Sequence, residues 1–535
     1  MNQQAHPTTK TQPGALGFPL GREGRLVAIL ILATAALRLG LGTLIGLSVD
    51  ESYAVVMSRR VALSYYDHPP FLFWIPRLAA WLTGSESQAA VRLPFILMFM
   101  GTTWLTYRLG ARLFNERAGL WAAVGLNLAL FFTLPVAGWV LPDGPLLFWS
   151  VAAVHCLVAA TICDGRGPAA PDEGGPRIVA RSTLAWAGFG LLAGLALLSK
   201  YHAAFLLAGA GLFLLTSKEH RPWLARPQPY LAFVLALVVF SPVLIWNATH
   251  DWASIRFQGG RAVPLEAEQD TPLLGAIAGQ AAWMLPWIWV PLLVVMLDAL
   301  RRGPREPRRW LPFCLGVGPV AFFTIVAGFG RRGLPHWEAP GYFMLLPVLG
   351  EWVAERLEHG SRWIRGWLWA STIGLLAALV LIVTQVRTGW IARAAPGLLS
   401  RGDPTDDLIQ WQPMARQLAA WGYPRKGVAT AGATWADAAK LAYALGPKVP
   451  VVSVGGDPRG FEFVRSQRTL LGHDVLLVAR RRSGEMEPML VYAPFFARIT
   501  PLGTLPLDRN GNEAIQVSAY LGERLLEVPP PKAVR

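Results

Sequence analysis

The residues best suited to chemistry lie in one stretch near the N-terminus, residues 48–74. Asp50 and Glu51 are adjacent acids that follow directly on a long apolar run, residues 26–49. A carboxylate beside an apolar segment loses hydration, which is costly and usually marks a function. A general base must be ionised, close to its substrate and partly shielded from water. Asp50 meets these requirements and Glu51 is a second candidate, although one of the two acids could instead cap the helix that starts here.

A second polar cluster follows one short helix later. Tyr66, Asp67 and His68 stand directly before Pro69 and Pro70. A residue before proline is disfavoured in a helix, so this segment is expected to form an extended turn. Such a turn can hold a phosphate or sugar group beside Asp50. The alternative is a turn that only redirects the chain.

Further candidates for substrate binding lie at the expected outer ends of later apolar runs. A phosphate leaving group needs cations or hydrogen-bond donors around it. Lys200 is a lone cation between apolar segments, although snorkelling to the interface explains it equally well. Asp143 either shares in substrate binding or caps its helix. The remaining candidates are Tyr201, Arg256, Arg261, Arg331 and His336.

Patterns for metals and nucleotides are missing from the sequence. The nine histidines show no HExxH or paired spacing, so catalysis without a metal is expected. A divalent cation held by Asp50, Glu51 and Asp143 remains an alternative. Neither GxGxxG nor GxxxxGK[ST] occurs, which favours a lipid-linked over a nucleotide-linked donor.

The elements that must position these residues are membrane helices. Of the 535 residues, 53% are hydrophobic and only 16% are charged, as is typical of a polytopic membrane protein. Apolar runs long enough to cross a bilayer predict about eleven spans. These spans are approximately 26–47, 89–108, 118–136, 144–163, 183–199, 201–217, 229–247, 272–298, 311–329, 338–353 and 364–387.

The loop charges predict the topology. The net charge is +15, but most Lys and Arg lie in short clusters in alternate loops, which is the positive-inside pattern and not that of a nucleic-acid-binding protein. The pattern predicts a cytoplasmic N-terminus, with residues 1–25 as a disordered tail before an uncleaved signal anchor. The membrane domain covers 26–387. Residues 388–535 show turn signals and short Val-rich runs, which predict a small α/β domain on the outer, periplasmic side of a bacterial inner membrane.

Five sequence strings also carry a family resemblance. They are DESYAVVMSRRVALSYYDHPP, LPDGPLLFW, LLSKYHAAFLLAG, FQGGR and LPHWEAPGYFMLLP. In this order and between these spans, they resemble the bacterial family 39 glycosyltransferases. That family is related to protein O-mannosyltransferases and to the lipid A aminoarabinose transferase, and all have the GT-C membrane fold. The tail segment GDPTDDLIQW resembles the start of the periplasmic domain of bacterial members.

The resemblance implies an enzyme that moves a sugar from a polyprenyl-phosphate carrier to a periplasmic acceptor, with inversion at the anomeric carbon. It also implies that Asp50 is the general base. The acceptor class stays open among lipid A, another glycolipid, a glycan and a protein. The aminoarabinose transferase has Lys before the two prolines, whereas this chain has Asp67-His68, and that departure argues against aminoarabinose as the sugar.

Two other functional classes compete with a transferase. A transporter or flippase of a lipid-linked substrate would also have basic outer pockets, but it should show inverted repeats or broken helices. An inactive scaffold would not need acids and cations in several separate outer loops.

Overall fold

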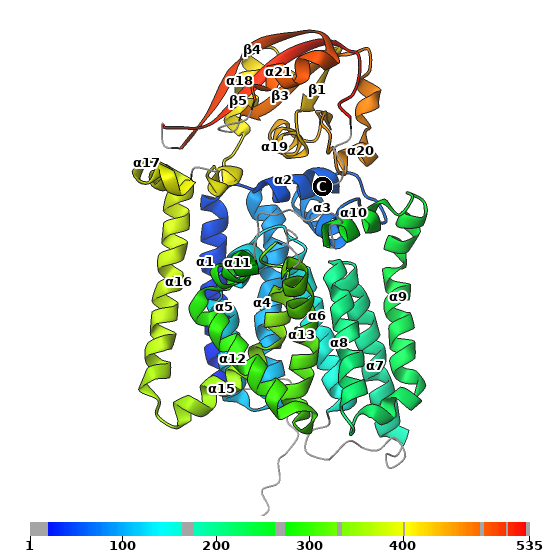
Figure 1. Ribbon diagram of the computed structural model, residues 1–535, viewed down its shortest axis with the longest axis vertical. Coiled ribbons are helices and arrows are strands. Elements are labelled where there is room, and N and C mark those ends of the chain that lie inside the picture. The colour runs from blue at the N-terminus through cyan, green and yellow to red at the C-terminus, as the bar shows by residue number, and fades with distance from the viewer. Residues whose placement is uncertain are drawn as a thin grey trace, which may run out of the picture.

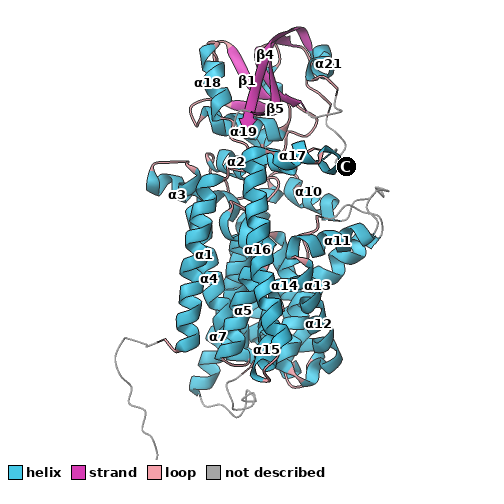
Figure 2. Ribbon diagram, turned by 90° about the vertical axis from the view of Figure 1, so that its left-hand side faces the viewer, coloured by secondary structure: helices cyan, strands magenta, loops and turns pink. Residues whose placement is uncertain are grey.

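The computed structural model describes residues 20–162, 176–262, 273–328, 334–399, 402–481, 486–509 and 512–530. A bundle of long helices carries a smaller α/β domain at one end (Figures 1 and 2). Short helices lie between these two parts. The predicted fold class, a helical multi-pass membrane protein with a small C-terminal α/β domain, is confirmed.

Seven of the described helices are long and apolar enough to cross a membrane. Each coincides with a span expected from the sequence. They are α1 (Arg22–Leu44), α4 (Gln88–Leu113), α6 (Asp143–Thr161), α7 (Pro176–Leu197), α9 (Pro227–Ala248), α13 (Pro307–Gly328) and α16 (Arg362–Thr388).

The span expected at residues 272–298 is two helices, α11 (Leu273–Met284) and α12 (Pro286–Arg302). The pair is bent by 107°. Leu285 at the break has φ +69°, a conformation that no helix allows, and Pro286 has no N–H to continue the helix. If this bent pair counts as one span, the described residues provide eight.

The other three expected spans are shorter or interrupted helices. Residues 118–136 form α5 (Glu116–Leu128) and a π-helical turn, Phe132–Val136. Residues 201–217 form a 3₁₀ turn, Tyr201–Ala203, and α8 (Ala204–Thr216). Residues 338–353 form α14 (Ala339–Met344) and α15 (Leu346–Glu358). Proline or a residue that favours turns lies in each of these segments, which limits the length of the helices.

Three short helices lie at the end of the bundle that faces the α/β domain (Figure 1). They are α2 (Val49–Ser58), α3 (Phe71–Thr83) and α10 (Ala253–Ala262). Helix α3 begins directly after the two prolines Pro69 and Pro70. This layer of short helices carries most of the candidate residues.

The C-terminal domain is built on one five-stranded sheet in the order β2-β1-β3-β5-β4. Strands β1 (Val428–Gly432), β2 (Val451–Ser453) and β3 (Asp474–Arg481) are parallel, whereas β4 (Phe496–Arg509) and β5 (Asn512–Leu525) form an antiparallel hairpin next to β3. The helices are α17 (Trp390–Ala394), α18 (Gln412–Ala420), α19 (Trp435–Leu445), α20 (Phe461–Val464) and α21 (Pro488–Tyr492).

The C-terminal domain is fixed to the bundle through α19, which packs on α2. The buried Lys440 on α19 donates to the carbonyl oxygen of Leu47 at 2.7 Å, and Arg59 at the end of α2 donates to the carbonyl of Ala442 at 3.0 Å. A Cβ atom at Gly46 would lie only 2.2 Å from the carbonyl oxygen of Leu408, so only glycine allows this approach. The loop that leads to Asp50 is thereby held from both sides.

Candidate active site

Asp50 lies in the first turn of α2, and the sequence fixes this position locally. The Ser48 hydroxyl accepts a hydrogen bond from the backbone N–H of Glu51, and the Glu51 carboxylate accepts one from the N–H of Ser48. This capping box starts the helix at Val49. Of the two acids, Glu51 therefore takes part in capping, and Asp50 points elsewhere.

The Asp50 side chain is exposed, and among the described residues it has no hydrogen-bond or ion-pair partner. Protein nevertheless surrounds the space that it faces, and this desolvation raises the pKa of the Asp50 carboxyl. The guanidinium groups of Arg459 and Arg261 oppose the rise, whereas Asp407 and Glu51 add to it. A free carboxylate of raised pKa, next to cations, has the properties of a general base.

Glu51, the second catalytic candidate, is fully buried and all its contacts are structural. Arg92 on α4 holds both carboxylate oxygens at 2.7 Å, and the backbone N–H of Val140 donates to one of them at 3.0 Å. Arg92 also donates to the carbonyls of Gly42, Ile45 and Gly46. These bonds leave Glu51 little capacity to take a proton from a substrate, and they fix the position of its neighbour Asp50.

Asp67 and its neighbours in the turn lie on the same side as Asp50. The buried Asp67 carboxylate accepts a hydrogen bond of 3.0 Å from the Tyr53 hydroxyl. That hydroxyl also accepts one of 3.1 Å from the backbone N–H of Gly460, in the C-terminal domain. Burial raises the pKa of Asp67 to about 6, against the opposing effect of Arg459.

Lys200 and Asp143 form a buried ion pair of 2.8 Å. Lys200 follows α7, and Asp143 is the first residue of α6, so the pair joins the outer ends of two spans. The expectation that Lys200 binds substrate is thus untested. In this structure Lys200 neutralises Asp143 and adds positive potential to the site.

Two histidines face this cation and stay neutral. Burial lowers the pKa of His68 well below its usual value, with Lys200 and Arg261 acting in the same direction. The same causes lower the pKa of His336 to about 4. The Nδ1 atom of His68 is buried and has no hydrogen-bond partner within the described part of the chain. A neutral imidazole with a free ring nitrogen can bind a polar group of a substrate.

Arg261, at the end of α10, is a cation without an ion-pair partner in the described chain. Its guanidinium lies 5.4 Å from the ring centre of Phe257 and 5.9 Å from that of Trp337. Burial and the charge of Arg459 lower its pKa, whereas Asp67 and Asp50 raise it. The charge of Arg261 therefore interacts with both acids of the site.

The remaining candidates divide into two groups. Tyr66 stacks on Phe463 of the C-terminal domain and packs on Phe257, and the Tyr201 hydroxyl lies 2.7 Å from that of Ser254, so both help to build the layer of short helices around the site. Arg256 is exposed. Arg331 lies outside the described residues.

The C-terminal domain contributes a residue that sequence reasoning missed, Arg459. Its guanidinium lies over the Trp435 ring at 3.7 Å and pairs with Asp457 at 3.3 Å. It is also the charge with the strongest effect on Asp50 and on Asp67. Arg459 has φ +47°, a left-handed conformation that is rare outside glycine and is a sign of function when it occurs at a site.

The position of Arg459 follows from the topology of the sheet. Trp435 comes shortly after β1 and Arg459 shortly after β2, so both extend from the carboxyl ends of parallel strands. Ligand-binding loops of open α/β sheets lie at this edge. Arg459 follows Gly455-Gly456-Asp457-Pro458, which the sequence indicated only as a turn. The Val-rich run before this turn, which forms β2, was the signal that could have marked a site.

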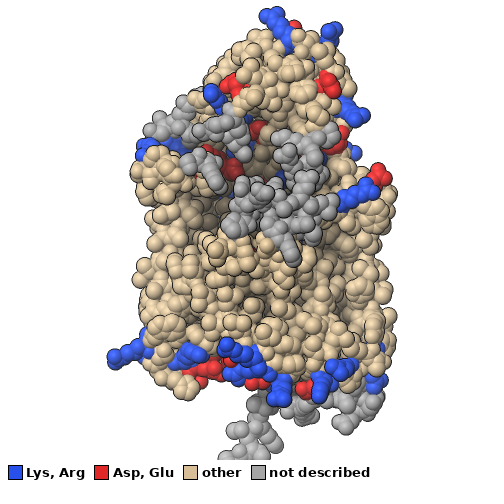
Figure 3. Space-filling model, viewed as in Figure 1, with Lys and Arg blue, Asp and Glu red and all other residues tan. Residues whose placement is uncertain are grey.

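Together these residues form a polar site between the bundle and the C-terminal domain. The space-filling view is hollowed at this level, with acidic and basic side chains at the hollow (Figure 3). One free carboxylate, two arginines and two neutral histidines can accept a proton and stabilise a phosphate. No group of three metal-binding side chains occurs among the described residues. Glu51 and Asp143, expected as ligands in the alternative with a divalent cation, each bind a basic side chain instead.

The chain has the fold of the GT-C membrane proteins. It superimposes on the crystal structure of ArnT from Cupriavidus metallidurans with a TM-score of 0.62, 16% sequence identity and coverage of 92% of this chain and 97% of that chain. The ArnT structure bound to undecaprenyl phosphate gives the same TM-score, with 15% identity and the same coverage.

Sequence comparisons agree with this class. The family model of dolichyl-phosphate-mannose-protein mannosyltransferases matches residues 67–168 and 177–246. The lipid A galacturonosyltransferase RgtD of Rhizobium johnstonii is 27% identical over 343 residues, which are 63% of this chain. The undecaprenyl phosphate-α-4-amino-4-deoxy-L-arabinose arabinosyl transferase of Erwinia tasmaniensis is 22% identical over 351 residues, 62% of this chain. The matched regions span 66% and 57% of these relatives. The protein is similar to the family 39 glycosyltransferases, as its motifs predict.

Proposed function

We propose that this protein transfers a sugar from a polyprenyl-phosphate carrier to an acceptor hydroxyl. The observation that carries the proposal is the free Asp50 carboxylate, whose pKa is raised by desolvation and lowered by the charges of Arg459 and Arg261. Asp50 takes the proton of the acceptor hydroxyl, while the oxygen of that hydroxyl attacks the anomeric carbon of the donor sugar. The bond from that carbon to the phosphate oxygen breaks, and the phosphate leaves with the electron pair. Attack opposite the leaving group inverts the anomeric centre.

The two arginines are well placed for the leaving phosphate, because charge develops on it as the bond breaks. Both are cationic, lie near Asp50 and carry guanidinium groups, which bind phosphate through two hydrogen bonds. The names of the two relatives give undecaprenyl phosphate as a carrier and lipid A as an acceptor. We propose that this chain also uses undecaprenyl phosphate as its carrier. The sugar and the acceptor class are left to measurement.

The charge distribution supports an outer location of the site. Figure 3 shows Lys and Arg gathered at the end of the bundle opposite the C-terminal domain, with a band almost free of charge between. By the positive-inside rule, the basic end is cytoplasmic. We therefore place the protein in the bacterial inner membrane, with a cytoplasmic N-terminus and with the site and the C-terminal domain in the periplasm.

The alternative is transport of a lipid-linked substrate. The 107° bend between α11 and α12 keeps this alternative open, because transporters bind substrates at broken helices. A transferase forms a new glycosidic bond in detergent solution, where no second compartment exists. A transporter does not, so product formation by the purified protein separates the two.

Binding of the carrier tests the proposal through Arg459. We expect the Arg459→Gln variant to bind undecaprenyl phosphate about tenfold more weakly, a loss of ~1.4 kcal/mol, because it lacks one charged partner of the phosphate. Titration of the purified protein, followed by tryptophan fluorescence, measures this. The control is Arg416→Gln, an exposed arginine on α18 of the same domain, which should bind as the unchanged protein does. Equal affinity of the Arg459 variant and the control contradicts the assignment.

Catalysis should also be independent of divalent metals. The negative charge that develops on the leaving phosphate is proposed to be stabilised by Arg261 and Arg459. Two of the three acids that could bind a cation, Glu51 and Asp143, are paired with Arg92 and Lys200. Treatment with excess EDTA, followed by removal of the chelator, is expected to leave the transfer rate unchanged. A rate that falls at least tenfold and returns with Mg²⁺, Mn²⁺ or Zn²⁺ contradicts this expectation.

A further inference from the structure

A basic pocket lies on the C-terminal domain, away from the Asp50 site. It has a volume of about 410 Å³ and is formed where the chain enters β1, β2 and β3. These are the amino ends of the parallel strands, whereas Trp435 and Arg459 extend from the carboxyl ends of β1 and β2. The pocket and the proposed active site therefore lie at opposite edges of one sheet.

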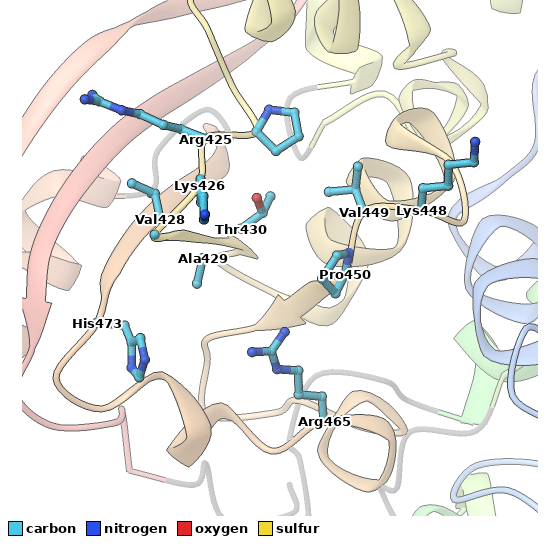
Figure 4. A pocket seen from close by; sticks show the side chains of 12 residues that line it. Arg425, Lys426, Val428, Ala429, Thr430, Lys448, Val449, Pro450, Arg465 and His473 are labelled. Carbon is cyan, nitrogen blue, oxygen red and sulfur yellow. The ribbon is translucent and has the colours of Figure 1, made fainter.

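Five of the twelve residues that line the pocket are basic and none is acidic. Arg465 points into the space, Lys426 and His473 lie along its walls, and Arg425 and Lys448 extend outwards on opposite sides (Figure 4). They come from four separate segments of the chain, so only folding brings them together.

These cations are unpaired, in contrast to others in this protein. Arg309 contacts four carboxylates, and Arg480 contacts Asp407 and Asp437. Among the described residues, no acid forms an ion pair with Arg425, Lys426, Lys448 or Arg465. Like charges that converge without acids destabilise the domain that carries them. A bound anion removes that repulsion.

The pocket opens beside the loop that follows α2, at the surface of the bundle. Arg60 in this loop donates to the carbonyl of Val464, next to Arg465, at 2.8 Å. Arg59 contacts the carbonyl of Gly446 at 3.5 Å, two residues before Lys448. The apolar side chains of Val61, Leu63 and Val464 are exposed here by 65%, 48% and 38%. Exposed apolar side chains among basic ones are typical of a protein surface that touches a membrane.

We propose that this pocket binds the phosphate group of an anionic membrane lipid. Its charge selects an anion, its amine and guanidinium groups suit phosphate oxygens, and the exposed apolar side chains of the neighbouring segments suit a position at headgroup level. Free phosphate shares this chemistry and is the second possible source of the ligand. The site does not depend on the transfer reaction, because it lies at the other edge of the sheet from Asp50.

The test compares two double variants of the full-length protein in detergent. Lys426→Glu/Arg465→Glu reverses two charges of the pocket. Arg416→Glu/Arg498→Glu reverses two exposed charges of the same domain outside it. The probes are inorganic phosphate, short-chain phosphatidylglycerol and short-chain phosphatidylcholine. Native mass spectrometry counts the bound molecules, and the thermal unfolding temperature is followed with increasing probe.

We expect phosphatidylglycerol to bind the unchanged protein and the control variant, and to bind the pocket variant at least tenfold more weakly. Phosphatidylcholine, which has no net charge, should not distinguish the three proteins. Binding of inorganic phosphate alone, lost in the pocket variant, supports the site with a free anion as its ligand. Equal binding of phosphatidylglycerol and phosphate to all three proteins overturns the proposal. A melting temperature of the pocket variant at or above that of the unchanged protein, without probe, shows that this variant folds.

Discussion

Replacement of Asp50 by Asn is expected to lower the turnover number for sugar transfer by about 10²–10⁴-fold, the contribution of a general base. Asparagine has nearly the same size and shape as aspartate but cannot accept the acceptor's proton. Because the Asp50 carboxylate has no partner among the described residues, the substitution breaks no hydrogen bond or ion pair that holds the fold. Turnover should therefore fall without a change in the melting temperature.

The affinity of Asp50→Asn for the carrier shows whether the variant has lost only catalysis or also recognition of the carrier. The phosphate is proposed to bind Arg261 and Arg459, so Asp50→Asn should bind undecaprenyl phosphate within about threefold of the unchanged affinity. Asp508→Asn, an exposed acid on β4, is the matched control and should keep full turnover. Turnover of Asp50→Asn within tenfold of the unchanged protein means that another group is the base.

The pH dependence of the turnover number of the unchanged protein is an independent test of Asp50 as the general base. Desolvation by the surrounding protein raises the pKa of Asp50, and a base acts only when it is ionised. The turnover number should therefore rise with pH through that raised pKa and reach a plateau above it. In Asp50→Asn, the residual turnover number should no longer rise with pH in this range.

Replacement of Arg92 by Leu is expected to have the largest effect on stability, about 3–5 kcal/mol. Glu51 is fully buried and would be left as an unpaired charge, and the carbonyl oxygens of Gly42 at the end of α1 and of Ile45 and Gly46 in the loop before Asp50 would lose the Arg92 donor. Because this loop positions Asp50, transfer should fall as well. Denaturant unfolding in detergent measures the loss of free energy.

The matched control for Arg92 is Arg117, which also pairs with a glutamate at 2.8 Å. In that pair, Arg117 and Glu358 are 58% and 48% exposed, so water replaces the lost partner. Arg117→Leu should change the free energy of unfolding by at most about 1 kcal/mol. A similar loss for the two variants contradicts a structural role for the Glu51–Arg92 pair.

The sequence was most informative where one property repeats over many residues. Apolar length and loop charge predicted seven spans that the structure contains, because a helix in lipid must satisfy its backbone hydrogen bonds internally. The bend at Leu285 was not predicted, although Pro286 was a visible signal. A proline can start, bend or end a helix, and its neighbours in space determine which of these occurs.

The candidate site was predicted in part, for a similar reason. The acids after the first span and the Asp67-His68 turn are close in sequence, and they lie together in the structure. The roles of Asp50 and Glu51 separate only when Arg92 is seen, 41 positions further along the chain. From the sequence, either acid could cap the helix, although the capping-box spacing of Ser48 and Glu51 was a signal that could have identified Asp50 as the free acid. Arg459 reaches the site from more than 400 residues away, and only the packing of α19 on α2 brings it there.

The measurement that tests the central claim most directly is mass spectrometry of envelope lipids and glycans. The strains are the parent, a deletion of this gene, and the deletion complemented with the unchanged protein or with Asp50→Asn. We predict that one envelope molecule loses the mass of one sugar in the deletion, regains it with the unchanged protein, and does not regain it with Asp50→Asn. Full recovery with Asp50→Asn would contradict the assignment of Asp50 as the general base.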